Sequence, residues 1–173
     1  PDQLTLFRKK EIDGAWTVEP WVTRLIREGG GRLFLDERKL WPQGMFVTAH
    51  LVARREFLLQ QRPLVEAWLA GHVAVTRAIN ADPARARRVI NREIRRYTGK
   101  ALPEEVLAEA WTRLAITYDP VPASLYRAAE WAFELGFLGQ RRPDLKGIYD
   151  LGPLNEVLRA LGLPEVKEDK AGL

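Results

Sequence analysis

Residues 14–21 read Gly-Ala-Trp-Thr-Val-Glu-Pro-Trp, and this stretch decides how the first part of the chain is interpreted. The run 14–18 is apolar, rich in aromatic and β-branched residues and bounded by turn residues, which predicts a buried strand. Pro20 suits the first turn of a helix, with Glu19 at or beside its cap. Apolar residues then continue at helical spacing: Trp21, Val22, Leu25 and Ile26. The stretch therefore predicts a strand that runs directly into a helix N-terminus.

Two further apolar runs, at 32–35 and 45–53, predict strands as well, and the longer one is typical of the middle of a parallel sheet. A charged linker at 36–44 separates them. The order strand, helix, strand predicts part of a parallel α/β sheet. Three strands make a poor independent sheet. We therefore expect another segment or another chain to complete it.

The remainder of the chain has a helical pattern. Pro, Asp and Gly residues mark the helix ends, since they cap or break helices. The expected helices lie at 2–10, 20–28, 55–61, 63–79, 83–98, 102–114, 122–138 and 153–161. The fold class predicted is α/β, with few parallel strands and a helical majority.

The composition excludes several classes of protein. The 173 residues are enough for one domain or slightly more, and an apolar fraction of 46% can bury a core. The absence of cysteine excludes a disulfide framework, a thiolate zinc site and a cysteine nucleophile. No apolar run approaches the roughly 20 residues that span a bilayer. The first residues do not form a signal peptide, so we expect no export signal in this chain.

The charge is mildly basic, with 27 Lys and Arg against 23 Asp and Glu and a net charge of +4. This balance is weak evidence for any partner. The densest basic cluster lies at 85–100, and a solvated helix face explains it better than a nucleic-acid site. Neither a recognition-helix signature nor a set of stacking aromatics supports the second interpretation. We expect no nucleic-acid partner.

No catalytic or metal motif stands out. Ser124 is the only serine and lies within a helical pattern. His50 and His72 lie on apolar faces, where a packed structural role is favoured over a ligand or a base. The glycines at 29–31 end a helix, whereas a phosphate-binding loop opens one. We therefore expect no enzyme activity, no metal and no cofactor.

One constellation remains, formed by Trp16, Thr17, Glu19 and Trp21. It lies at the carboxyl end of a predicted strand, the edge at which open α/β sheets bind ligands. A helix N-terminus there offers N–H groups to an anion, and the indoles could wall a small pocket. In the alternative interpretation both tryptophans belong to the core and the glutamate is only a cap. The pattern leaves both open.

Two segments resemble a known family. Residues 10–21, KEIDGAWTVEPW, resemble a segment of the ABC-transporter solute-binding proteins of the nitrate, sulfonate and taurine class, which also includes bicarbonate and thiamine-pyrimidine-precursor binders. Residues 57–65 resemble a helix pair of these proteins. Their C-terminal signature resembles TYDP at 117–120, ELGFL at 134–138, PDLKGIYDL at 143–151 and LNEVL at 154–158. The resemblance follows nearly the whole chain in the right order.

The resemblance implies a two-lobed type II periplasmic-binding-protein fold with its ligand between the lobes. It assigns residues 1–36 to the end of the second, ligand-binding lobe and 45–173 to the C-terminal, mostly helical part of the first lobe. Residues 37–44 would form the hinge crossing, with hinge residues Trp41, Pro42 and Gly44.

The chain resembles the C-terminal half of such a protein, whose full-length form is expected to be periplasmic or an extracellular lipoprotein. The expected partners are a small-molecule ligand, an ABC permease in the membrane, and the missing N-terminal half or a second copy of the chain.

The family's cleft residues carry over to Trp16, Thr17, Glu19 and Trp21. Glu19 departs from what an anion site needs, because a carboxylate repels an anion. It either points away as a cap or meets a donor such as an aminopyrimidine. The expected function is the substrate-binding component of an ABC importer for a small anion such as a sulfonate, nitrate or bicarbonate. The alternatives are a thiamine pyrimidine precursor as ligand, and a ligand-incompetent interaction module that self-associates or is completed by another chain.

Overall fold

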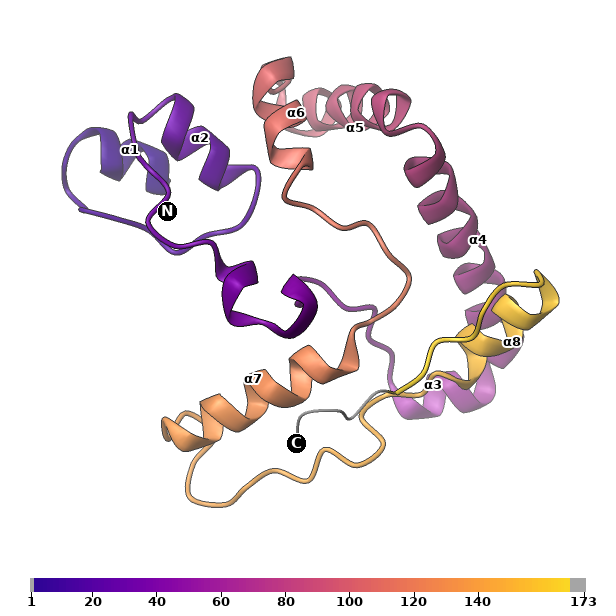
Figure 1. The fold of residues 1–173 in the computed structure, drawn as a ribbon. Coiled ribbons are helices and arrows are strands. Elements are labelled where there is room, and N and C mark those ends of the chain that lie inside the picture. Colours follow the sequence, from indigo (N-terminus) through magenta and orange to yellow (C-terminus); the bar gives the residue numbers. More distant parts are fainter. Residues whose placement is uncertain (1, 169–173) are drawn as a thin grey trace. The chain divides into compact units, whose positions relative to one another are not determined.

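The computed structural model describes residues 2–168, apart from the side chain of Pro42 (Figure 1). More than half of these residues lie in helices. The chain divides into two compact units, which are taken separately below. Unit 1 contains the residues up to Asp36 together with Ala78–Ile116, and unit 2 contains Glu37–Arg77 and the chain from Thr117 onward.

Unit 1 is built on helices α1 (Gln3–Arg8), α2 (Trp21–Arg27), α5 (Pro83–Thr98) and α6 (Glu104–Trp111). Helix α2 packs against both α1 and α6, and α5 packs against α6. The buried side chains that join them are Leu4, Thr23, Leu25, Ala86, Val106, Leu107 and Ala110. Burial of these apolar groups is the main favourable contribution to the stability of the unit.

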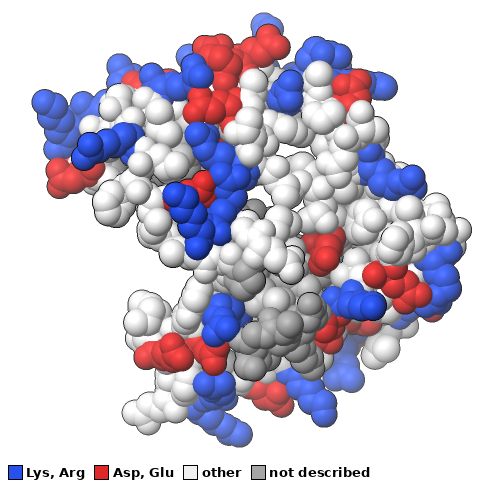
Figure 2. Space-filling model, in the orientation of Figure 1, with Lys and Arg blue, Asp and Glu red and all other residues white. Residues whose placement is uncertain are grey.

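Local capping explains where the unit 1 helices begin and end. The Asp2 carboxylate accepts from the Thr5 backbone N–H at 3.3 Å, and Asp82 accepts from the Arg85 N–H at 2.9 Å. Gly99, with φ of 81°, ends α5 in the left-handed conformation that glycine adopts without strain. The arginines of α5 lie mostly at the surface, as expected: Arg85, Arg88, Arg92, Arg95 and Arg96. Figure 2 shows basic and acidic side chains interspersed over the face drawn, in keeping with the small net charge.

Unit 2 contains the short 3₁₀ helices η1 (Glu37–Leu40) and η2 (Pro42–Gly44), and α3 (Arg55–Gln60), α7 (Pro122–Glu134) and α8 (Gly152–Ala160). Most of the long helix α4 (Arg62–Ala81) belongs to it too. Its core cluster is Val73, Leu154, Val157, Leu158 and Val166. Val73 and Leu158 are fully buried, which places the centre of this unit between α4 and α8.

The three residues set aside as structural lie in unit 2. Ser124 is buried at the start of α7, where its Oγ accepts from the Val47 N–H at 3.0 Å. His50 Nε2 lies 2.7 Å from the Tyr149 hydroxyl, which confirms a hydrogen-bonded role for His50. His72 is exposed and stacks on Trp68, so its predicted burial is wrong.

The three predicted strands are wrong: the described chain carries no strand at 14–18, 32–35 or 45–53. Many of their apolar side chains are exposed, with Trp16 at 67%, Phe34 at 97% and Val52 at 83%, while Phe46 is partly buried. Apolar, β-branched runs have strand propensity, but a strand also needs a neighbour that accepts its backbone hydrogen bonds. None of the three segments supplies that neighbour to another, so the predicted parallel sheet is not formed within residues 2–168.

The helices, in contrast, were predicted correctly, with errors at their ends. The predicted helix at 102–114 is the shorter α6, and the one predicted at 122–138 ends at Glu134. Gly136 has φ of 79°, so the chain turns there instead of continuing the helix. Within the described range no helix combines the length and the apolar content needed to cross a membrane.

Candidate functional site

The Glu19 side chain is 4% exposed and directs its carboxylate inward. Its Oε2 accepts from the Thr23 backbone N–H at 3.1 Å, so Glu19 caps α2 from the residue before its N-cap, Pro20. Its Oε1 accepts from Arg113 Nη1 at 2.9 Å. Of the two roles left open for this residue, the structure has the cap, with an arginine as its second partner.

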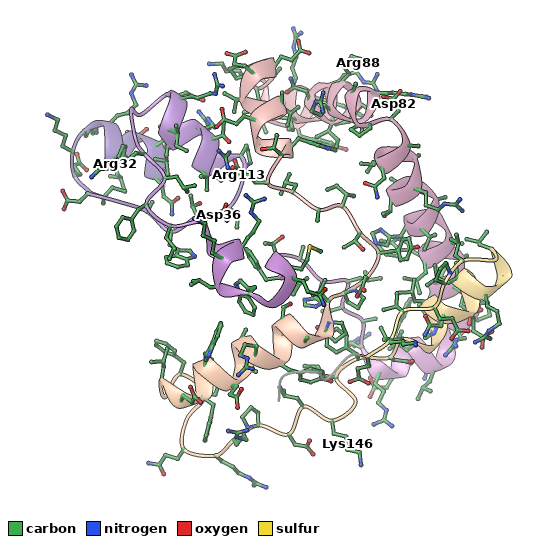
Figure 3. The ribbon with its side chains drawn as sticks, viewed as in Figure 1. Arg32, Asp36, Asp82, Arg88, Arg113 and Lys146 are labelled. Atoms are coloured by element: carbon green, nitrogen blue, oxygen red, sulfur yellow. The ribbon has the colours of Figure 1, made fainter. Side chains whose placement is uncertain are left out.

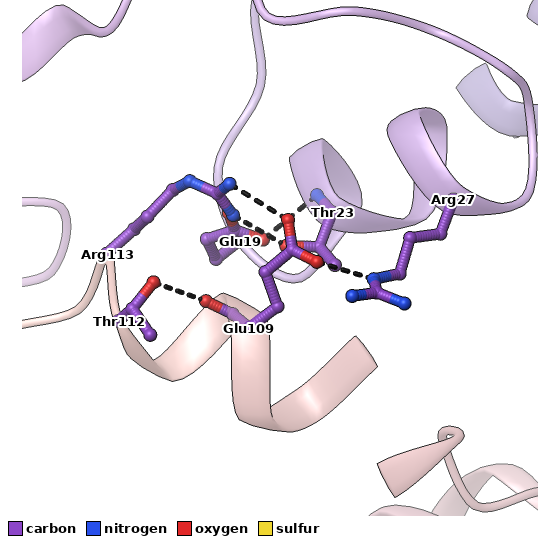
Figure 4. Close-up of polar contacts among 6 residues, drawn as sticks. All are labelled: Glu19, Thr23, Arg27, Glu109, Thr112 and Arg113. Carbon is purple, nitrogen blue, oxygen red and sulfur yellow. Dashed lines mark hydrogen bonds and ion pairs between the residues drawn. The ribbon is translucent and has the colours of Figure 1, made fainter. Parts of the chain in front are cut away.

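Arg113 follows the end of α6 and reaches the start of α2, as Figure 3 shows. Besides Glu19, its Nη1 donates to the Thr23 hydroxyl at 2.9 Å, and its Nη2 donates to Glu109 at 3.0 Å. Glu109 also accepts from Arg27 Nε at 2.5 Å (Figure 4). We call these five residues, Glu19, Thr23, Arg27, Glu109 and Arg113, the Glu19–Arg113 network.

The network is electrically balanced, since it holds two carboxylates and two guanidinium groups. Burial opposes the charge of Arg113, but hydrogen bonds to Glu109 and Glu19 outweigh it and raise the pKa of Arg113. Hydrogen bonds from Arg27 and then from Arg113 lower the pKa of Glu109. Each carboxylate of the network therefore has a guanidinium partner at hydrogen-bond distance.

The first N–H groups of α2 already have partners inside unit 1. The Trp21 N–H donates to the Val18 carbonyl at 2.9 Å, the Val22 N–H to the same carbonyl at 3.4 Å, and the Thr23 N–H to Glu19. These are the groups with which a helix N-terminus holds an anion. We call the surface at Trp16, Thr17 and Trp21 the Trp16–Trp21 edge. A ligand there would therefore be held by side chains and not by these three backbone groups.

The two indoles of the predicted site are accessible. Trp16 is 67% exposed and Trp21 is 37% exposed, so the alternative that both belong to the core is wrong. The Arg24 guanidinium lies 4.8 Å from the centroid of the Trp21 ring and pairs with Glu28 at 2.8 Å. Thr17 is partly exposed between the tryptophans in sequence. The edge offers aromatic surface, a hydroxyl and one stacked, paired cation.

The predicted hinge residues belong to unit 2. The Trp41 ring stacks on Phe46 at a centroid distance of 5.5 Å and tilts against Trp131 of α7 at 5.0 Å, and its Nε1 donates to Glu37 at 3.1 Å. Gly44 ends η2 with φ of 67°, a conformation that favours glycine. Pro42 opens η2. Their role as a hinge stays a prediction.

Sequence reasoning missed Arg24 and Arg113. Arg24 could have been found, because it follows Trp21 by three residues and helical residues three apart share a face. Arg113 lies 94 residues from Glu19 in the chain, and no spacing rule joins the two. The structure brings Glu19 together with Arg113, while Trp16 and Trp21 remain at the surface of the unit.

The cavity found in the described chain does not include the predicted site residues Trp16, Thr17, Glu19 and Trp21. A cavity of about 350 Å³ lies in unit 2, along α7 and the loop that follows, with Glu130, Phe133, Arg142 and Lys146 in its lining. Residues 2–168 contain no group of three or more His, Cys, Asp or Glu side chains placed to hold a metal.

Residues 1–93, more than half of the chain, match the model of the NMT1-like family. No curated protein and no solved structure is significantly similar to the chain.

Proposed function

Because the chain belongs to the NMT1-like family, the family of nitrate-, sulfonate- and taurine-binding proteins, we propose that it is the ligand-binding component of an ABC importer. The family has a periplasmic-binding-protein-like fold, is typically periplasmic and is generally not enzymatic. We extend these properties to this chain: its partners are a small-molecule ligand and a membrane permease, and it acts outside the cytoplasm, in the periplasm or as an extracellular lipoprotein. The lobe assignment made from the sequence, at 1–36, 37–44 and 45–173, is part of this proposal.

The proposed ligand is a small anion such as a sulfonate, nitrate or bicarbonate. The proposed contact residues are Trp16, Thr17 and Trp21. Glu19 lies among them in the sequence, caps α2 and pairs with Arg113. The observation that favours an anion is the engagement of the Glu19 carboxylate by Arg113 and Thr23. An aminopyrimidine would need that carboxylate as an accessible acceptor, but the Glu19 side chain is 4% exposed and both of its oxygens already accept a hydrogen bond. This makes the thiamine pyrimidine precursor the second choice.

Isothermal titration calorimetry tests the ligand class. The full chain is titrated with taurine, ethanesulfonate, nitrate, bicarbonate and an aminopyrimidine. We expect heat with at least one anion and none with the pyrimidine. Trp21→Ala is expected to weaken that binding at least tenfold, while Trp68→Ala, which removes an indole 54% exposed in unit 2, leaves it unchanged. Heat with the pyrimidine alone would replace the anion by the alternative ligand, and silence with all five would reject the binding function.

A second function is favoured by a different observation. The segments 32–35 and 49–53 lie outside the helices and expose apolar side chains, with Phe34 at 97% and Val52 at 83%. Such segments are templates for strand pairing with another chain. In this alternative the chain is a ligand-incompetent interaction module, covered by a second copy or by another polypeptide that supplies strands. Light scattering tests the self-associating form of this alternative, because a stable monomer of 19.8 kDa would argue against it.

A further inference from the structure

Arg113 joins the start of α2 to α6, and it also places a positive charge next to the Trp16–Trp21 edge. One of its terminal nitrogens, Nη1, is shared between Glu19 and Thr23, at 2.9 Å from each. Thr23 is fully buried and the Glu19 side chain is nearly so, whereas the Arg113 side chain keeps 21% of its surface exposed. The positive charge of Arg113 therefore lies directly against the carboxylate of Glu19, which is two residues from Thr17 and two from Trp21.

The charge of Glu19 matters for any anion that approaches this edge. Two like charges several ångströms apart repel even in water, and they repel more strongly where protein excludes water. Arg113 supplies the opposite charge at hydrogen-bond distance, and Arg27 balances Glu109 in the same way. The four charged side chains of the Glu19–Arg113 network thus sum to no net charge, although residues 16–21 contain a glutamate (Figure 4).

We infer that Arg113 is a specificity-determining residue: by compensating the charge of Glu19, it lets the Trp16–Trp21 edge admit an anion. The inference rests on the proposed function in its choice of ligand class. Arg113 acts through Glu19 and is a positioning residue that need not touch the ligand. Without it, the network would hold two carboxylates against the single guanidinium of Arg27, and the edge would repel the ligands proposed above.

The test measures the local potential without any ligand. The chain is labelled with 5-fluorotryptophan, and the resonances of Trp16 and Trp21 are assigned with Trp16→Phe and Trp21→Phe. Paramagnetic relaxation of each resonance is then compared between an anionic and a neutral gadolinium chelate. The ratio of the relaxation caused by the anionic chelate to that caused by the neutral chelate reports how readily an anion approaches that indole. Trp68, in unit 2, serves as the internal control.

Four variants decide the outcome. Arg113→Met is expected to lower the ratio at Trp16 and Trp21 about twofold, the change that one unit charge makes at this range after screening by salt. Arg113→Lys keeps the charge and holds the ratio. Glu19→Gln raises it, and the double variant Arg113→Met/Glu19→Gln returns it toward the wild-type value. A purely structural arginine would not show this restoration, because the second substitution removes another contact.

Unchanged ratios in Arg113→Met and Glu19→Gln would overturn the inference. Should Arg113→Met fail to fold, as judged by circular dichroism, a cationic gadolinium chelate decides. If Arg113 compensates Glu19, the anionic and the cationic chelate approach Trp16 and Trp21 equally in the wild type, and Glu19→Gln favours the anionic one. If the charge is not compensated, the wild type already favours the cationic chelate, which overturns the inference. Calorimetry with the anion panel completes the test. A wild-type chain that binds none of the anions rejects the proposed function, while the chelate ratios still report on Arg113. Binding that survives Arg113→Met rejects the inference and leaves the proposed function standing.

Discussion

Both units contain the same device, an asparagine that holds a backbone segment eleven residues further along the chain. In unit 1, Asn91 Nδ2 donates to the Leu102 carbonyl at 2.9 Å, and Asn91 Oδ1 accepts from the Leu102 N–H at 2.8 Å. In unit 2, Asn155 makes the same pair of hydrogen bonds to Val166, both at 2.9 Å. In each case the chain leaves a helix through a glycine with positive φ and then turns back: Gly99 and Gly162.

The difference lies in what each asparagine holds. Val166 is 8% exposed and belongs to the core cluster of unit 2, whereas Leu102 remains partly exposed. Unit 1 also contains the Glu19–Arg113 network between α2 and α6. Unit 2 contains instead two tyrosines, Tyr126 and Tyr149, whose pKa values are raised. The comparison teaches that one local device can hold a segment that belongs to the apolar core in one unit and a partly exposed segment in the other. The substitutions below separate these two modes.

The largest effect is expected from the centre of unit 2. Leu158→Ala removes a side chain that is fully buried between α4 and α8, and such truncations cost about 2–5 kcal/mol because a cavity remains. Urea unfolding measures the loss. Leu161→Ala, three residues on and 48% exposed, is the matched control and should change stability by no more than about 0.5 kcal/mol. Equal losses from the two variants would contradict the core assigned here.

The two asparagines give the next effect. Asn155→Ala leaves the buried backbone groups of Val166 without partners and is expected to cost about 2 kcal/mol. Asn91→Ala is expected to cost about 1 kcal/mol, because water can reach the Leu102 groups. Hydrogen exchange at the Val166 and Leu102 amides localises each loss. If Asn91→Ala proves the more damaging variant, the closing segment of unit 1 matters more than its exposure indicates.

Sequence reasoning succeeded where the deciding interactions are local. Helices α1 and α5 were predictable because Asp2 and Asp82 cap them and Gly99 ends α5, all within one turn of the helix concerned. The strands were not, because a strand depends on a partner that propensity does not reveal. The same limit applies to the site. The pattern gave Trp16, Thr17, Glu19 and Trp21, but the orientation of Glu19 depends on an arginine far away in sequence.

Raising the pH above 10 should lower the free energy of unfolding through two tyrosines of unit 2. Burial and then the contact with Glu168 raise the pKa of Tyr126 to about 12, and burial and the charge of Glu168 raise the pKa of Tyr149 to about 12. An unfolded tyrosine ionises near 10, so this stabilisation is complete below pH 10 and is lost as the pH rises from 10 toward 12.

Urea unfolding at several values between pH 9 and pH 11.5 measures the slope. Tyr126→Phe should make it shallower, while Tyr97→Phe, which alters an exposed side chain of unit 1, should not. A slope that Tyr126→Phe leaves unchanged would place the alkaline loss elsewhere.

Lowering the pH below about 4.5 should lower the free energy of unfolding through Glu109 of unit 1, and this is the smallest effect expected. The pKa of Glu109 is lowered by its hydrogen bonds to Arg27 and Arg113, so its contribution is complete above its ordinary value of 4.5 and is lost as the pH falls through the lower folded value. Glu109→Gln should flatten the fall in unfolding free energy between pH 5 and pH 3. Glu105→Gln, on the same helix and without an ion pair in the described chain, should leave it unchanged. If both variants keep the wild-type slope, the charged network does not stabilise unit 1, and apolar packing holds both units alike.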